Sequence, residues 1–512
     1  MAIVQTLTPT DDGHRRLGLA SPATRESVGE IVVTTPDEVT AAIARARAAQ
    51  PAWAARPVKE RAAILRRAVE VVIAHQEEIV KTVQDETGKP RVEALAVEIL
   101  PTCDFVNYWS RRAAKDLADE RVSLHGYLKP FKKLMLHYQP LGVVGVITPW
   151  NGPFVLSMNP VVQALLAGNA VLLKPSEVTP HSGGWAAKVL HEAGVPEDVL
   201  LLLPGDGETG AALVSGDIDK ISFTGSVATG KKIAAACAGR LIPCTLELGG
   251  KDAMIVCADA DLERAAGGAV NLSMFNAGQV CIGVERIYVV ESIADAFIKL
   301  VQEKAAAVTY GPEAGKDVGP LFWDRQLDIV SRHVEDAKAK GATILVGGEA
   351  EPDKGLFYQP TVVVDVTHDM DLMTDETFGP VVAIMRVQDE AEAVRLANDS
   401  RYGLSGSVFT KDKAKAVRIG KQLRTGSVCQ NDASVIYGVP EGPFGGRKDS
   451  GLGQVNGRFA IRSFTFTQPI LLDRWGMKKE SIWYPYTDKT AKTLENTVKF
   501  AFGNKFMRRL MS

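Results

Sequence analysis

The sequence has few cysteines for its length, and none of them has a spacing typical of a metal site. Six cysteines occur in 512 residues, far fewer than in a secreted domain held together by disulfides. No pair has C-x-x-C spacing, and neither an H-E-x-x-H motif nor a Cys/His cluster is present. We therefore predict no metal site and expect the reducing compartment of the cytoplasm.

Long apolar runs and an excess of one charge are also missing. No stretch of 18 apolar residues occurs, and the start, MAIVQTLTPTDDGHRRLG, lacks the basic and apolar regions of a signal peptide. A formal net charge of −2 argues against a general affinity for nucleic acid. With 46% hydrophobic and 23% charged residues, the composition is that of a globular chain of about two or three domains.

The chain up to about residue 115 has a helical pattern. A first helix begins at TTPDEVT, where Thr35, Pro36 and Glu38 form a capping box. A second helix is expected over residues 57–88 because apolar residues recur there at helical spacing. A third helix is expected over residues 92–114.

From Leu141 onward, short β-rich runs alternate with helical segments. The runs before Gly250 are GVVGVITP, AVLLKP, VLLLLPG, KISFTG and CTLELGG, and those after it are DAMIVC, RIYVV, ATILVGG, QPTVVVDV and VVAIMRV. Such alternation predicts an α/β fold in which helices cover both faces of parallel sheets. Two series of runs indicate two lobes, with a cleft near residues 246–250.

Candidate binding residues follow several of these strands, where ligands of open parallel sheets bind. They are Trp150 and Asn151; Lys174 and Glu177; Gly225, Ser226 and Gly230; and Leu248 and Gly249. Read singly, each group also fits an ordinary turn, and FTGSVATG lacks the full G-x-G-x-x-G spacing of a dinucleotide site. Glu247 ends an apolar strand, where a carboxylate has to be paired or functional. Cys281, in NAGQVCIGVER, read alone fits a small buried hydrophobe.

The ordered set of motifs TPWN, KPSE, FTGS, ELGGK, GQVC, DETFGP and PFGGRKDSG resembles the aldehyde dehydrogenase superfamily, in its hydrolysing, NAD(P)-dependent branch. The resemblance covers roughly residues 20–472. It implies that Cys281 attacks the aldehyde and that the Asn151 amide, with the Cys281 N–H, stabilises the oxyanion. Glu247 would then activate the water that hydrolyses the thioester. The other five cysteines match no motif, and we interpret them as structural.

The resemblance also implies a cofactor site and a domain plan. The cofactor residues would be Trp150, Lys174, Glu177, Gly225, Ser226, Gly230, Leu248, Gly249, Glu376 and Phe378. NAD is expected rather than NADP, because the Glu177 carboxylate would repel a 2′-phosphate. Residues 1–120 and 141–250 would form a Rossmann-type cofactor domain and residues 251–440 an α/β catalytic domain. Residues 121–140 and 455–472 would form a small β bridging element, with strands at LMLHYQ and over 459–472, which builds homodimers or homotetramers as in the family.

Three other functions remain open. One is oxidation of a semialdehyde such as succinate semialdehyde. The residues proposed to line the aldehyde tunnel are mostly apolar and disfavour such a substrate; they are Phe154, Met158, Val280, Ile282 and the loop 432–440. A coenzyme-A-acylating dehydrogenase would not need Glu247. A non-catalytic family member would have lost Cys281, Glu247 or Asn151.

The tail, residues 473–512, extends beyond the family pattern. Leu494, Val498, Phe502, Phe506 and Leu510 recur every four residues, with basic residues between them. We therefore expect an amphipathic basic helix over 490–511, weakened at Gly503. Its apolar stripe should be buried in the protein's own oligomer, which we favour, on a membrane surface as a peripheral contact, or on another partner.

Overall fold

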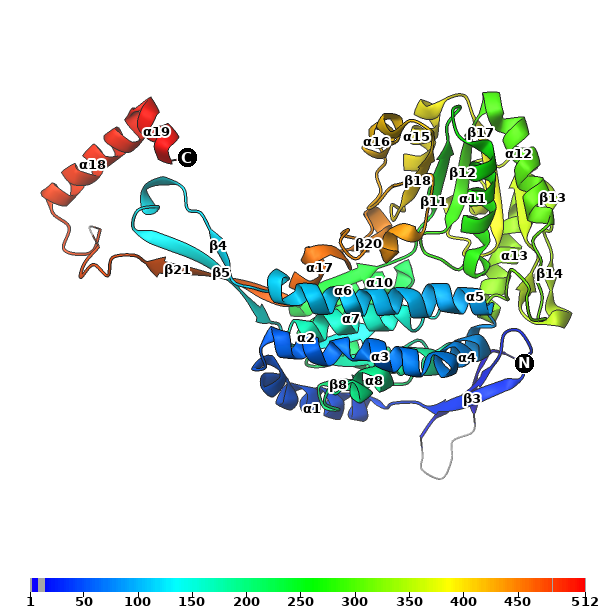
Figure 1. Cartoon of the computed structure of the whole chain (residues 1–512), viewed down its shortest axis with the longest axis horizontal. Helices are drawn as coiled ribbons and strands as arrows, with labels where there is room; N and C mark the ends of the chain where they lie inside the picture. Colours follow the sequence, from blue (N-terminus) through cyan, green and yellow to red (C-terminus); the bar gives the residue numbers. More distant parts are fainter. Residues whose placement is uncertain (1, 8–13, 481, 512) are drawn as a thin grey trace.

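Two parallel sheets organise the body of the chain in this computed structural model, and a narrow arm projects from it (Figure 1). The structure describes residues 2–7, 14–480 and 482–511. The α/β class predicted from the alternating runs is confirmed.

The first sheet has six strands in the order β20-β10-β9-β6-β7-β8. Its parallel strands are β6 (Val143–Ile147), β7 (Ala170–Lys174), β8 (Leu200–Leu202), β9 (Lys220–Thr224) and β10 (Cys244–Glu247), and β20 (Gly451–Leu452) joins β10 antiparallel. The connecting helices are α7 (Val155–Leu166), α8 (Pro180–Glu192), α9 (Gly207–Ser215) and α10 (Val227–Arg240). The chain moves outward from β6 through β7 to β8 and then returns to β9 on the other side of β6. The strand order therefore reverses between β6 and β9.

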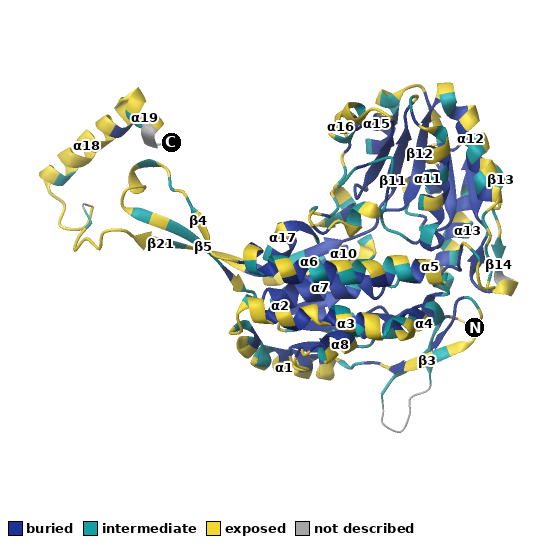
Figure 2. Cartoon of the chain, in the orientation of Figure 1, coloured by how far each residue is buried: buried dark blue, intermediate teal, exposed yellow. Residues whose placement is uncertain are grey.

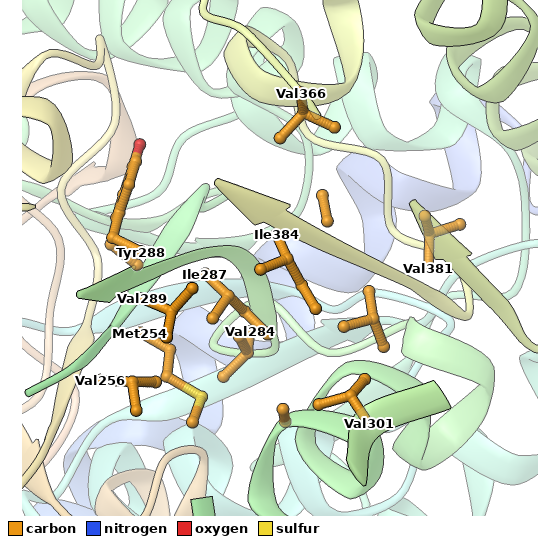
Figure 3. Close-up of a cluster of buried hydrophobic side chains, with 14 of the residues drawn as sticks. Met254, Val256, Val284, Ile287, Tyr288, Val289, Val301, Val366, Val381 and Ile384 are labelled. Atoms are coloured by element: carbon orange, nitrogen blue, oxygen red, sulfur yellow. The ribbon is translucent and has the colours of Figure 1, made fainter. Parts of the chain in front are cut away.

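The second sheet has seven strands in the order β13-β16-β17-β12-β11-β18-β19. The strands are β11 (Asp252–Val256), β12 (Val284–Val290), β13 (Thr343–Val346), β16 (Thr361–Val364), β17 (Val381–Val387), β18 (Gly406–Phe409) and β19 (Cys429–Gln430); β13 alone among them runs antiparallel to its neighbour. The helices are α11 (Leu262–Met274), α12 (Glu291–Ala306), α13 (Asp324–Ala339), α14 (Asp371–Thr374), α15 (Glu390–Asn398) and α16 (Lys413–Gly420), and a hairpin of β14 (Ala350–Glu351) and β15 (Phe357–Tyr358) lies at the edge. Figure 3 shows the core of this sheet, where Met254, Ile287 and Ile384 of three neighbouring strands pack together.

The N-terminal region differs in part from the prediction. The sequence pattern missed a small antiparallel sheet of β1 (Val4–Leu7), β2 (Arg16–Ala20) and β3 (Ser27–Val32). The capping box of α1 (Pro36–Ala54) is confirmed, with Thr35 Oγ1 accepting from the Glu38 N–H at 3.3 Å and Glu38 Oε2 accepting from the Thr35 N–H at 2.8 Å.

The prediction that residues 57–88 form one continuous helix is wrong. The segment forms α2 (Val58–Arg66), α3 (Ala68–Ala74) and α4 (Gln76–Thr87). The helices meet at Arg67, whose Nε donates to the Ala193 carbonyl at 2.9 Å, and at His75, whose Nε2 pairs with Glu192 at 3.0 Å. These tertiary contacts fix the bends, and the spacing of apolar residues in the segment does not reveal them.

The third helix consists of α5 (Arg91–Glu93), a π-helical turn (Ala94–Ile99) and α6 (Leu100–Asp116). The π-helical turn carries Glu98 toward the interior, where its side chain is fully buried. Such turns frequently occur near functional sites.

The arm is a three-stranded antiparallel sheet in the order β21-β5-β4, formed by β4 (Glu120–Val122), β5 (Lys132–Pro140) and β21 (Thr465–Asp473). The strand expected over 459–472 is shorter, because its first residues belong to α17 (Gly457–Arg462).

The tail forms α18 (Asp488–Gly503) and α19 (Lys505–Met511), so the single helix predicted over 490–511 is broken at Asn504. Within this chain the apolar stripe is not buried: Leu494, Val498, Phe502 and Phe506 are all exposed, and the side chain of Leu510 lies outside the described residues. Figure 2 shows the arm and tail as largely exposed, in contrast to the body.

Candidate functional site

The carboxyl ends of the parallel strands of the first sheet lie along one edge and bring the predicted residues together. Trp150 and Asn151 follow β6, Lys174 ends β7, Gly225 and Ser226 follow β9, and Glu247 ends β10. The strand order reverses between β6 and β9, and open α/β sheets bind ligands at such a reversal. The sequence predicted the strand ends, but only the topology brings the turns after β6 and β9 next to each other.

Cys281 lies in a tight loop between α11 and β12, facing the end of β10. Asn276 and Ala277, just before it, have left-handed backbone conformations with φ of 57° and 54°. The loop also passes close to the chain that connects the two sheets, because a Cβ at Gly250 would overlap the Cys281 carbonyl oxygen. Glycine at position 250 thus lets Cys281 approach the end of β10.

Carboxyl groups dominate the electrostatics around Cys281. Burial, followed by the charges of Glu247 and Glu376, raises the pKa of the Cys281 thiol well above its usual range. Burial and then Glu376 raise the pKa of the Glu247 carboxyl to about 8, and the Cys281 thiol counteracts this rise only in part. Glu247 Oε1 has no hydrogen-bond partner among the described residues. A buried carboxyl of this kind, with an open acceptor oxygen, is suited to take a proton near neutral pH.

Asn151 approaches the same loop from the other side. Its side-chain Nδ2 donates to the Gln279 carbonyl at 2.9 Å, two residues before Cys281. This bond uses one of the two N–H groups of the amide and fixes the orientation of the other. Asn151 is buried, so the remaining N–H is a donor held in a nearly dry environment.

A buried ion pair that the sequence analysis missed supports Asn151. Lys89 Nζ pairs with Glu98 Oε1 at 2.8 Å, and both side chains are fully buried. Lys89 Nζ also donates to the Asn151 carbonyl at 3.1 Å, while Glu98 Oε2 accepts from the N–H groups of Phe154 and Val155 at the start of α7. The only signal in the sequence was a glutamate between the apolar residues of AVEIL.

The predicted adenosine side of the cofactor site contains a second close pair. Lys174 Nζ lies 3.2 Å from Glu177 Oε2; the Lys174 side chain is nearly buried, and that of Glu177 is 28% exposed. Ser226 caps α10, its Oγ accepting from the Thr229 N–H at 3.4 Å. A Cβ at Gly230 would lie 2.5 Å from Leu248 Cδ2, so this glycine lets α10 pack closely against the end of β10.

The predicted nicotinamide side lies on the second sheet. Glu376 is half-buried, and its Oε1 accepts from the Gly250 N–H at 2.9 Å. A Cβ at Gly249 would overlap the Glu376 carboxyl. Phe378, with φ of 53°, packs edge-on against Trp150, with 5.5 Å between ring centroids.

A further buried pair missed by the sequence analysis holds the DETFGP loop. Glu285 accepts from the Thr377 N–H at 2.8 Å and from the Phe378 N–H at 3.0 Å. Lys251, fully buried, pairs with Glu285 at 2.5 Å and donates to Thr377 Oγ1 at 3.0 Å. These bonds fix the loop that carries Glu376 and Phe378.

Apolar side chains surround Cys281 on the side of the expected aldehyde tunnel. Ile282, Leu404 and Phe444 form a buried cluster, and Cys281 and Tyr437 pack against it. The nearby Arg286 is buried, and its guanidinium donates to the carbonyls of Lys251, Leu396 and Ala397 and to Tyr288 Oη. Arg286 is therefore engaged in holding the second sheet together.

The remaining cysteines lie apart from this centre. All six cysteines are free thiols. Within the described residues, one group, Cys257 with Asp259 and Glu390, is close enough to share an ion. Lys415 already lies between its two carboxylates, 2.8 Å from Asp259 and 3.1 Å from Glu390.

Comparison with known proteins identifies the fold and the family. Residues 9–470 match the model of the aldehyde dehydrogenase family. The chain is 43% identical to a putative succinate-semialdehyde dehydrogenase [NADP(+)] of Mycolicibacterium smegmatis over 450 residues, covering 87% of this chain and 86% of that protein. It is 37% identical to a 4,4'-diapolycopene aldehyde oxidase of Methylomonas sp over 491 residues, covering 96% and 92%.

Among solved structures, an aldehyde dehydrogenase of Mycobacterium tuberculosis complexed with NAD+ superposes with a TM-score of 0.86 at 37% identity, covering 91% of this chain and 96% of that one. The predicted family, with the fold typical of it, is thereby confirmed. The chain belongs to the aldehyde dehydrogenase family and is an oxidoreductase that oxidises aldehydes with a nicotinamide dinucleotide.

Proposed function

We propose that the chain converts an aldehyde to its carboxylic acid through a covalent thioester on Cys281. The observation that carries the proposal is the convergence of the Cys281 thiol, the buried Glu247 carboxyl and the Asn151 amide at the junction of the two sheets. This arrangement contains a nucleophile, a base and an oxyanion donor.

The residues act in the following order. The Cys281 thiol first gives its proton to water, and the resulting thiolate sulfur adds to the aldehyde carbon while the carbonyl electron pair moves to oxygen to give a hemithioacetal oxyanion. The free N–H of Asn151 and the Cys281 backbone N–H donate to this oxygen. A nicotinamide held by Trp150, Glu376 and Phe378 would supply the acceptor for the hydride of this carbon. The C=O bond re-forms, leaving a thioester on Cys281.

Glu247 completes the cycle. Its carboxylate takes a proton from water as the water oxygen adds to the thioester carbon. The C–S bond then breaks, the acid leaves, and the Cys281 sulfur regains its charge. A coenzyme-A-acylating enzyme would need no such base, so the buried, partly unpartnered Glu247 favours hydrolysis.

The cofactor site fits a dinucleotide on two observations. The start of α10 presents backbone N–H groups beside Gly225 and Ser226, as anion sites at helix ends do, and it lies at the reversal of the strand order. The adenosine ribose would be held by Lys174 and Glu177, and the nicotinamide half by Trp150, Glu376 and Phe378. The surface of the site beneath the dinucleotide would be formed by Gly230, Leu248 and Gly249.

We propose NAD rather than NADP as the working cofactor. Glu177 lies in the turn after β7, where its carboxylate would accept hydrogen bonds from ribose hydroxyls but would repel a 2′-phosphate. The relative from Mycolicibacterium smegmatis is named as NADP-dependent, and the structure from Mycobacterium tuberculosis is complexed with NAD+. A direct measurement with both cofactors therefore has to decide.

The substrate we propose is an apolar aldehyde. The cluster beside Cys281 is apolar, and Lys89, Lys251 and Arg286 are each committed to buried protein partners. The second candidate is succinate semialdehyde, on the strength of the 43% identical relative. A carboxylate substrate needs a cation near its far end, and these three buried cations are already engaged.

The domain plan and assembly are part of the same proposal. The first sheet with its helices would bind the cofactor, and the second would carry the nucleophile. The arm would pair with a second copy through the open edge of β21, giving a dimer or tetramer. A cytoplasmic location suits a mechanism that needs Cys281 as a free thiol.

The proposal is tested by NADH formation with NAD and a panel of hexanal, decanal, benzaldehyde and succinate semialdehyde, each with and without coenzyme A. We expect turnover without coenzyme A and the highest kcat/KM for the apolar aldehydes. A strict requirement for coenzyme A would replace hydrolysis by acyl transfer. Preference for succinate semialdehyde would support the second candidate, and no NADH with any aldehyde would refute catalysis.

A further inference from the structure

The outer end of the arm and the tail together expose an unusual number of aromatic side chains. The arm contributes Tyr127 and Phe131, and the tail contributes Trp475, Trp483 and Tyr484, with exposures from 40% to 78%. We call these residues, with the exposed face of α18, the distal surface. Figure 2 shows it at the end of the molecule farthest from the second sheet.

The two parts of the distal surface are held together by several bonds. The Trp475 indole N–H donates to the Pro130 carbonyl at 2.7 Å, and the Arg474 N–H donates to the Phe131 carbonyl at 2.9 Å. Lys132 pairs with Asp473 at 3.1 Å and with Glu480 at 2.6 Å. Residues 473–480 at the start of the tail are therefore fixed to the arm, and Trp475 is held beside the arm segment that carries Phe131.

The tail continues this surface with an amphipathic helix. Leu494, Val498 and Phe502 follow one another along one face of α18 and are 42%, 57% and 52% exposed. Only Ala501 of this helix is buried. A helix that exposes this much apolar surface to water is expected to bind another molecule or a membrane through that face.

The charge of this region is opposite to that of the rest of the chain. Residues 473–512 contain nine Lys or Arg and four Asp or Glu, whereas the whole chain has a net charge of −2. Residues 121–140 of the arm add four basic residues and no acidic one. Basic residues are thus concentrated beside the exposed aromatic ones.

We infer that the distal surface docks on an anionic lipid bilayer. Lysine is depleted in the buried centres of protein interfaces, whereas Trp and Tyr beside Lys and Arg are enriched at membrane surfaces. The tail combines six lysines with seven aromatic residues. The sequence pattern favoured docking within the protein's own oligomer; the connection of the tail to exposed aromatic residues of the arm now favours lipid.

The inferred contact is peripheral. Among the described residues, no helix has both the length and the apolar character needed to cross a bilayer. The aromatic side chains would enter the headgroup region, and the lysines would lie near lipid phosphates. The inference does not depend on which aldehyde is oxidised.

Flotation of the full chain with vesicles tests the inference. Vesicles of phosphatidylcholine with 30% phosphatidylglycerol are compared with phosphatidylcholine alone, at low and at high salt. We expect flotation with the anionic vesicles and its loss at high salt, because charge attraction is screened. The oligomeric mass is measured in parallel by analytical ultracentrifugation without lipid.

Two matched variants make the test specific. In the tail variant, Lys489, Lys492, Lys499 and Lys505 become Glu; in the control, the exposed Lys59, Lys411, Lys413 and Lys421 of the body become Glu. Each lysine near an anionic surface contributes about 1 kcal/mol to binding, or about fivefold in affinity. The loss of four lysines should therefore weaken vesicle binding of the tail variant by at least about a hundredfold. The control should bind anionic vesicles much more tightly than the tail variant, and both should retain NADH formation in solution.

Three outcomes would overturn the inference. The first is that the full chain floats with neither kind of vesicle. The second is that the tail variant and the control bind equally. The third is that the tail variant loses oligomeric mass while the full chain does not float, which would assign the distal surface to a second copy of the chain.

Discussion

Cofactor choice depends on one carboxylate, and replacing Glu177 by Gln tests it directly. Glu177 follows β7, beside the proposed position of the adenosine ribose. A 2′-phosphate bound there would lie close to the carboxylate. Gln keeps the size and the hydrogen-bonding oxygen of the side chain but removes its charge. The change therefore isolates electrostatic repulsion from shape.

The expected magnitude follows from the geometry of the pair. Two unit charges about 5 Å apart at an effective dielectric constant near 20 interact with about 3 kcal/mol. Lys174 Nζ, 3.2 Å from Glu177 Oε2, offsets part of this repulsion, and the 28% exposure of Glu177 allows screening by solvent. We therefore expect a net penalty on NADP of about 1–3 kcal/mol, or roughly 5- to 150-fold in kcat/KM.

The assay is the ratio of kcat/KM for NAD to that for NADP, measured with one aldehyde at low and high ionic strength. Glu177→Gln should lower this ratio by the same factor of roughly 5 to 150, and added salt should lower it in the wild type. Glu197→Gln is the matched control, because it removes the same charge from an exposed position ahead of β8, at the opposite end of the strands. The reasoning fails if the wild type uses NADP as well as NAD, or if Glu177→Gln leaves the ratio unchanged.

Four further predictions concern the catalytic centre. Cys281→Ala should reduce turnover below about a thousandth of wild type while NAD binding, followed by fluorescence, stays intact; greater activity would exclude Cys281 as the nucleophile. Glu247→Gln should give one burst of NADH followed by a slow steady state, and a mutant without a burst would place Glu247 in an earlier step. In the wild type the deacylation rate should rise as the pH increases through about 8, because the Glu247 carboxyl, with its raised pKa, becomes ionised there; the mutant should lack this rise. Asn151→Ala should lower kcat about 10²- to 10³-fold, and a change under tenfold would argue against an oxyanion role. Glu98→Gln should lower the free energy of unfolding by roughly 3–5 kcal/mol in urea, because Lys89 stays buried without its counter-charge. Lys89→Met combined with Glu98→Gln should recover most of the loss, because the buried charge is gone and the amide oxygen at position 98 can still accept from the N–H groups of Phe154 and Val155; equal stabilities of the single and double variants would contradict this.

The sequence by itself determined the class of fold and the chemical groups of the site. Alternating β-rich and helical runs are local patterns, so they predicted the α/β class, most of the helices and the edge along which Asn151, Lys174 and Glu247 lie. The ordered motifs were specific enough to identify the family. The capping box at Thr35 was also predictable, because it involves residues only three apart.

Only the tertiary structure decided the features that depend on distant residues. The Lys89–Glu98 and Lys251–Glu285 pairs form because each buried charge is stabilised by the opposite charge beside it, and neither spacing is a known motif. The predicted helix over 57–88 was wrong because contacts of Arg67 and His75 with Ala193 and Glu192, at the end of α8, bend the chain. The reversal of strand order between β6 and β9 follows from the path of the whole sheet, as does the attachment of Trp475 to the arm. The local pattern of apolar and polar residues thus determines the helices, the strands and the reactive side chains of the site. Burial and sheet topology determine which of these side chains come into contact.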